Sequence, residues 1–206
     1  MRKATKAVAM WFGILAGIAG LEHGYFEILQ GNTRPASMMF PSWGPQQCDP
    51  TIIWHACEPA MSILPNFLVT GIITVLLGLA IMAWSAWFLQ RKHGGIVLIS
   101  LSIAFLLFGG GFFPPIIGIV GGLAGTQINR PLSGRPGRIT RLATKLWPWP
   151  LVIFLVWVLG QFPFGYFFND FLKSIMVFSM LLILSSLPLS VYSAYAHDAS
   201  MAGRGE

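Results

Sequence analysis

Long apolar runs alternate along this chain with short segments that are polar or rich in proline. A helix that crosses a bilayer needs about 20 mostly apolar residues. By this measure the runs predict helices at 7–29, 63–89, 94–113, 149–168 and 171–195. We therefore expect an all-α fold, a polytopic bundle of transmembrane helices that forms a single domain over residues 1–206.

A shorter apolar stretch, 116–128, has only 13 residues and would be about 20 Å long as a helix. It follows a cluster of glycines and prolines, which we take as a hinge: Gly109, Gly110, Gly111, Pro114 and Pro115. We expect a short broken span here, in addition to five full helices. The complete bundle would then have six crossings, with both termini in the cytoplasm.

The distribution of basic residues supports six crossings, because Lys and Arg favour cytoplasmic loops. With six crossings 11 of the 13 Lys and Arg residues lie inside, whereas five crossings leave only 6 of 13 there. The orientation makes 31–61 an extracytoplasmic loop and 129–147 a basic cytoplasmic loop. The 11 residues are Arg2, Lys3, Lys6, Arg91, Lys92, Arg130, Arg135, Arg138, Arg141, Lys145 and Arg204.

Composition agrees with a membrane protein: 55% of the residues are hydrophobic and 10% are charged, against about a quarter charged in soluble domains. This excludes a disordered chain, a disulfide-dense scaffold and a coiled coil. We interpret the net charge of +6 as a topology signal and expect no nucleic-acid partner. The basic loop 129–147 could bind anionic lipid head groups, although a role in topology alone explains it more simply.

The amino terminus, with Arg2, Lys3 and Lys6 before an apolar run, resembles a signal peptide. We interpret it as a retained first helix. At 100° per residue, four glycines share one face of this helix and would allow another helix to approach closely. They are Gly13, Gly17, Gly20 and Gly24.

His23, Glu27 and Gln30 are expected beside that glycine face, whereas Glu22 points away. Ionisable residues within a membrane helix suggest a functional site, but a hydrogen-bonded structural role explains these equally well. On the second predicted helix a polar residue recurs every four positions, and the stripe either lines a water-filled path or bonds to neighbouring helices. Its members are Glu58, Ser62, Asn66, Thr70 and Thr74. An outer vestibule built from both helices would include Glu22, His23, Glu27, Gln30, His55, Glu58, Asn66 and Thr70.

Cys48 and Cys57 are the only cysteines, and both lie in the outer loop. An oxidising compartment favours a disulfide between them. The alternative is a metal site formed by His23, Glu27, His55 and Glu58, with or without the two thiols, but these spacings match no specific ligand pattern. The motifs indicate no cofactor, and we find no recognisable catalytic motif.

The segments EHGYFEILQGN (22–32), CEPAM (57–61) and GGGFFPP (109–115) together resemble a set of uncharacterised prokaryotic polytopic membrane proteins. The resemblance covers the first two thirds of the chain best and implies no established activity. It implies a multi-pass protein of the prokaryotic cell (inner) membrane.

Three hypotheses for the function follow. The first is a small transporter or channel-like protein with an outer acidic and histidine-containing vestibule; the glycines of 109–125 fit a discontinuous transporter helix or simply tight packing. The second is an accessory or scaffold subunit whose glycine faces pack against a larger membrane complex. The third is a membrane metalloprotein or oxidoreductase that uses His23, His55 and the carboxylates. The expected partners are the lipid bilayer and either further copies of this chain or the subunits of a larger membrane complex.

Overall fold

The computed structural model of the chain describes residues 1–41, 58–132 and 137–203 and is mostly helical. The chain forms two compact units, Ala9–Thr126 and Met1–Val8 with Gln127–Glu206. The first helix, α1 (Lys3–Leu29), contributes to both. Each unit is described by itself. Cys48, His55 and Cys57 lie outside the described residues, as does any disulfide between the two cysteines.

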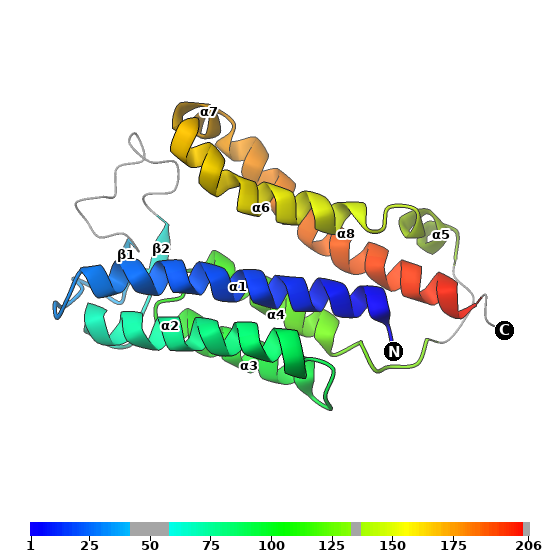
Figure 1. Ribbon diagram of the computed structural model, residues 1–206, viewed down its shortest axis with the longest axis horizontal. Helices are drawn as coiled ribbons and strands as arrows, with labels where there is room; N and C mark the ends of the chain where they lie inside the picture. Colours follow the sequence, from blue (N-terminus) through cyan, green and yellow to red (C-terminus); the bar gives the residue numbers. More distant parts are fainter. Residues whose placement is uncertain (42–57, 133–136, 204–206) are drawn as a thin grey trace. The chain divides into compact units, whose positions relative to one another are not determined.

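The unit Ala9–Thr126 holds most of α1 and three further helices that pack together (Figure 1). They are α2 (Phe67–Ala83), α3 (Gly94–Leu107) and α4 (Phe113–Gly125). A single π-helical turn, Trp84–Phe88, extends α2. Because α3 has 14 residues and α4 has 13, each is about 20 Å long.

The helix α2 begins four residues later than the sequence predicts. Pro65 disfavours a helical conformation at the preceding residue, Leu64, and the Asn66 side chain accepts a hydrogen bond of 3.0 Å from the Val69 N–H, which caps the helix. Glu58 and Ser62 therefore precede α2 and are not on its surface. The predicted polar stripe along one helix is wrong in this part.

The glycines of α1 lie in helix–helix contacts, as the spacing predicts. A Cβ added to Gly24 would lie 2.7 Å from the Gly71 carbonyl oxygen on α2, and one on Gly17 would lie 2.6 Å from that of Gly78. Gly20 faces the Phe105 ring of α3. The backbones approach so closely that no side chain fits between them.

A two-stranded antiparallel ribbon precedes α2. It pairs β1 (Met39–Pro41) with β2 (Pro59–Met61), with Phe40 opposite Ala60. The Phe40 ring packs edge-on against Phe67 at the start of α2, with a centroid separation of 4.8 Å. The ribbon thus anchors Glu58 and Ser62 beside the helices.

The predicted interruption between 94–113 and 116–128 is present. The helix α3 ends at Leu107, Gly109 and Gly111 adopt positive φ angles of 100° and 72°, and α4 begins at Phe113. Pro114 and Pro115 lie in the first turn of α4 and not before it, since a proline there sacrifices no helical hydrogen bond.

The second unit contains α5 (Arg138–Thr144), α6 (Trp149–Phe167), α7 (Asn169–Ser174) and α8 (Met176–Ala202). The helices α6 and α8 pack on each other. The Trp157 and Gln161 side chains of α6 both donate hydrogen bonds of 2.8 Å to the Ser179 hydroxyl of α8. The predicted helix 171–195 is divided in the structure: its first four residues belong to α7, and α8 begins at Met176.

The N-terminal turn of α1 belongs to the second unit and is capped by α8. The Asp198 carboxylate accepts hydrogen bonds from the Ala4 N–H at 3.0 Å and from the Thr5 N–H and hydroxyl at 2.8 Å. A carboxylate at a helix N-terminus satisfies N–H groups that have no partner inside the helix.

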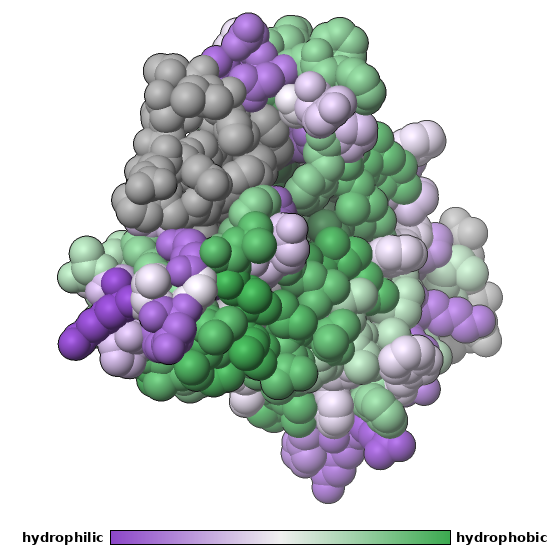
Figure 2. Space-filling model, turned by 60° about the vertical axis from the view of Figure 1, so that its left-hand side comes forward, coloured by the Kyte–Doolittle hydropathy of each residue, from purple (hydrophilic) through white to green (hydrophobic). Residues whose placement is uncertain are grey.

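Four described helices are long and apolar enough to cross a membrane: Lys3–Leu29, Phe67–Phe88, Trp149–Phe167 and Met176–Ala202. They indicate a membrane protein with transmembrane helices. Many large apolar side chains are exposed along them, and hydrophobic surface covers much of the face in Figure 2. The sequence predicts five full helices, but the third of these, α3, is short like α4.

Candidate functional site

Two ionisable side chains of α1 are buried in the unit Ala9–Thr126. His23 is 2% exposed and Glu27 is 0% exposed. They are four residues apart and so lie on the same side of the helix, beside the glycines that contact α2. This is the placement that the spacing predicts.

The turn between α3 and α4 covers both side chains. A Cβ added to Gly109 would lie 2.6 Å from the Glu27 Oε2 atom, and one added to Gly111 would lie 2.7 Å from the His23 Nε2 atom. Both glycines also have positive φ angles, which side chains with a Cβ rarely adopt. Glycine is thus required at both positions, for the backbone angle and for the contact.

The covering turn is fixed to the segment before α2. The Gly109 N–H donates to the Met61 carbonyl at 2.8 Å, and the Ile63 N–H donates to the Leu107 carbonyl at 3.0 Å. The Thr74 hydroxyl of α2 donates to the Phe108 carbonyl. The backbone over Glu27 is therefore held from two sides.

The Glu27 carboxyl group has no hydrogen-bond partner among the described residues, although both of its oxygens are buried. Leaving a charged group in this state is costly, so buried carboxylates are normally paired or neutralised. The cost disappears if the group holds a proton, and it falls if a cation or a hydrogen-bond donor lies beside it.

His23, one helical turn before Glu27, lies close to a more exposed acidic residue. Its Nε2 atom lies 3.7 Å from the Glu58 Oε1 atom, and Glu58 is half-buried. This separation is longer than a hydrogen bond but allows an ion pair when the imidazole is protonated. The Nδ1 atom of His23 is buried and has no hydrogen-bond partner in the described part of the chain.

The hydroxyl groups near the site have structural partners. The Thr70 methyl carbon faces Gly109, and its hydroxyl lies 3.0 Å from the Ser62 hydroxyl. Thr74 bonds to the covering turn, and Asn66 caps α2 and donates to Asn32. These contacts favour a structural role for the predicted polar stripe over a water-filled path.

The remaining predicted vestibule residues lie at the edge of the site or beyond it. Glu22 is half-buried, and the Gln30 side chain, also half-buried, donates to the Phe26 carbonyl at 3.3 Å. His55 is outside the described residues. Within those residues no three His, Cys, Asp or Glu side chains are grouped so that they could hold a metal ion.

The structure brings together two segments that the sequence marks separately, 22–32 and 109–115. Nothing in the spacing predicts that Gly109 lies on Glu27 and Gly111 on His23, because more than 80 residues separate them. The only indication in the sequence is that each segment interrupts an apolar run, the first with charged residues and histidine and the second with glycines and prolines.

No family model matches the chain, and no curated protein or solved structure matches it significantly.

Proposed function

We propose that this chain is a small transporter or channel-like membrane protein in which Glu27 binds the cation that moves. The observation that carries the proposal is the carboxyl group of Glu27, buried and without a hydrogen bond in the described residues, on a helix long enough to cross a membrane. Ionisable groups in such helices commonly mark ion pathways and proton relays.

Of the possible cations, a proton fits the donor set best. A metal ion needs several ligands, whereas a proton needs only one oxygen of the carboxyl group. Half-buried Glu58 lies 3.7 Å from buried His23, and fully buried Glu27 follows His23 by one turn of α1. Such a series of titratable groups can pass a proton by small movements of the side chains.

The contacts in the structure favour this function over a scaffold subunit. The glycine faces that would pack against a partner are used inside the chain, since Gly17 and Gly24 contact α2. Gly118, Gly121 and Gly122 of α4 face α3 or α1. We keep the inner membrane of a prokaryotic cell as the proposed location, because the resemblance of segments 22–32 and 109–115 implies it.

The test is proton flux into liposomes that contain the purified protein, driven by a potassium diffusion potential and read with an internal pH dye. We expect flux above that of empty liposomes for the unmodified protein and a loss of this flux in Glu27→Gln. Glu22→Gln is the matched control, since it removes a carboxylate from the same helix, and should retain the flux. Equal flux in Glu27→Gln and the unmodified protein, or none above empty liposomes, would contradict the proposal.

A further inference from the structure

A second polar region lies in the other unit, where the start of α1 meets the end of α8. A cavity of about 750 Å³ is bounded there by α1, the segment 129–132 and α8. This volume is within the range of small-molecule sites, about 300–1,000 Å³. The cavity shares no residue with the Glu27 site.

The cavity wall carries an excess of positive charge. Three basic side chains line it, Arg2, Lys3 and Arg130, and His197 adds an imidazole. The one acidic side chain among the described lining residues, Asp198, is engaged by the N–H groups of α1. An anion is therefore the ligand that the charge favours.

Arg2 is held in place and keeps unused hydrogen-bonding capacity. It is 6% exposed, and its Nε and Nη2 atoms donate to the Arg130 and Pro131 carbonyls at 3.1 and 3.0 Å. Its guanidinium group lies over the Tyr195 ring, 5.0 Å from the centroid. The Nη1 atom is buried and has no hydrogen-bond partner among the described residues. A fixed guanidinium group suits the geometry of a phosphate.

The surroundings of the cavity suit a lipid. Leu132 and Met201 add apolar surface to the wall, and the Trp147 ring lies 6.2 Å from that of His197. The cavity lies at the ends of two helices long enough to cross a membrane, where tryptophan and basic residues commonly meet lipid head groups.

From these observations we propose that the cavity binds the phosphate of an anionic phospholipid. Arg2 and Lys3 contact the phosphate from the start of α1 and the residue before it, and Arg130 contacts it from the segment before α5. The apolar part of the wall contacts the glycerol and the first carbons of the acyl chains. This site is independent of the proposed cation site.

Native mass spectrometry of the purified protein in detergent tests the proposal. The protein is titrated with phosphatidylglycerol, with phosphatidylcholine of the same acyl chains, and with inorganic phosphate as a competitor. We expect preferential binding of phosphatidylglycerol, weakened about fivefold for each basic side chain removed. Competition by inorganic phosphate at concentrations similar to those of the lipid would support the phosphate site and identify free phosphate as an equally good ligand.

Three variants of the cavity and one control separate binding from folding. Arg2→Gln removes the buried guanidinium group, but it also breaks two backbone contacts. The double variant Lys3→Gln with Arg130→Gln changes only exposed side chains and should fold normally. Lys145→Gln removes an exposed charge of the same unit outside the cavity and should bind as the unmodified protein does. Equal binding of the two lipids, or equal losses in Lys145→Gln and a single Lys3→Gln variant, would overturn the proposal.

Discussion

The helices α1–α4 and the pair α6 and α8 are all apolar, but they satisfy their polar groups in different ways. In α8 the serine hydroxyls bond to α6, as Ser179 does, or within their own helix, as Ser186 does to the Ile183 carbonyl at 2.8 Å and Ser190 to the Ser186 carbonyl at 2.6 Å. Between α1 and the turn that follows α3, Glu27 and His23 instead keep buried atoms that have no hydrogen-bond partner among the described residues. Among the described residues, the first group of helices thus holds a buried carboxyl group without a partner, whereas the α6–α8 contact leaves no such group.

The two groups also differ in how closely their helices approach. Glycines bring α1 against α2 with backbone in contact, whereas Gly160 of α6 has nothing within 4 Å of the position of its Cβ. The same substitution should therefore have opposite effects in the two regions.

The largest effect is expected for Gly109→Ala. The new methyl group would meet the Glu27 carboxyl group and Thr70, at a cost of about 1–3 kcal/mol for overpacking. The positive φ angle adds strain, also about 1–3 kcal/mol. The free energy of unfolding in detergent, measured by denaturant titration, should fall by this sum. Gly160→Ala is the control and should leave stability unchanged or raise it by up to about 1 kcal/mol; equal losses in both variants would show that the covering turn is not tightly packed.

Gly71→Ala should have a smaller but clear effect. Its Cβ would lie 2.7 Å from the Gly24 carbonyl oxygen and 2.8 Å from the Ile28 nitrogen, so α1 and α2 must separate. We expect a loss of about 1–3 kcal/mol in the same denaturant titration. A change below 0.5 kcal/mol, roughly the effect of a surface substitution, would mean that α1 and α2 are not in backbone contact.

Part of these glycine contacts can be predicted from the sequence. The spacing of Gly13, Gly17, Gly20 and Gly24 predicts a close helix neighbour and places His23 and Glu27 beside it. The break at Gly109–Gly111 is equally visible, because glycine and proline interrupt an apolar run. The sequence does not reveal that the break covers Glu27, since that contact depends on the packing of three helices.

The apolar pattern misplaces the start of α2 for a local reason. The apolar pattern begins at Ile63, but Pro65 and the Asn66 cap delay the helix to Phe67. Glu58 and Ser62 consequently lie on either side of β2, the strand that pairs with β1. Hydrophobic periodicity predicts which residues are in the membrane more readily than where a helix begins.

In the α6 and α8 pair, Ser179→Ala should cost about 0.5–1.5 kcal/mol. The substitution removes the hydroxyl that accepts hydrogen bonds from Trp157 Nε1 and Gln161 Nε2, and hydrogen bonds between membrane helices contribute about this much. Ser185→Ala, at an exposed serine that bonds only within α8, is the matched control. Thermal unfolding of both variants provides the measurement. Equal midpoints would show that Ser179 does not stabilise the contact between α6 and α8.

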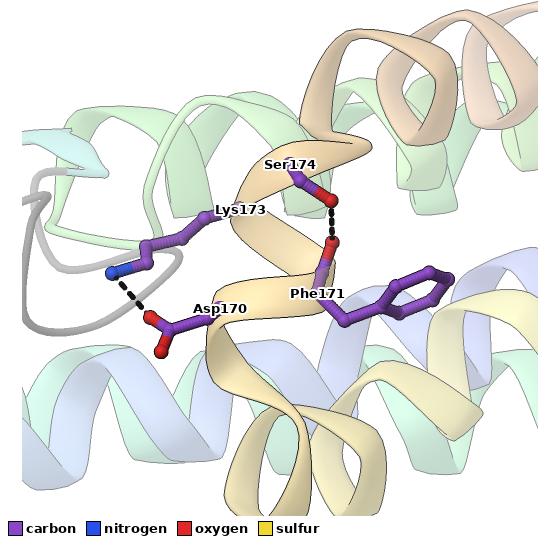
Figure 3. A network of polar contacts seen from close by, with 4 residues as sticks. All are labelled: Asp170, Phe171, Lys173 and Ser174. Carbon is purple, nitrogen blue, oxygen red and sulfur yellow. Dashed lines mark hydrogen bonds and ion pairs between the residues drawn. The ribbon is translucent and has the colours of Figure 1, made fainter.

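The smallest effect is expected for Lys173→Gln in α7. Lys173 Nζ lies 2.8 Å from the Asp170 Oδ1 atom (Figure 3), but the Asp170 side chain is 91% exposed. Exposed ion pairs typically contribute less than about 1 kcal/mol. A double-mutant cycle with Asp170→Asn isolates the pair; a coupling energy well above this range would show that α7 is more enclosed than its exposure indicates.

The most direct examination of the Glu27 site is chemical labelling with dicyclohexylcarbodiimide, an apolar reagent that attacks protonated carboxyl groups, followed by mass spectrometry of peptides. The proposed function predicts modification at Glu27, none at Glu22, and a loss of proton flux that parallels the extent of labelling. Labelling of Glu22 in preference to Glu27, or complete labelling of Glu27 with unchanged flux, would contradict the assignment of Glu27 as the group that binds the moving proton.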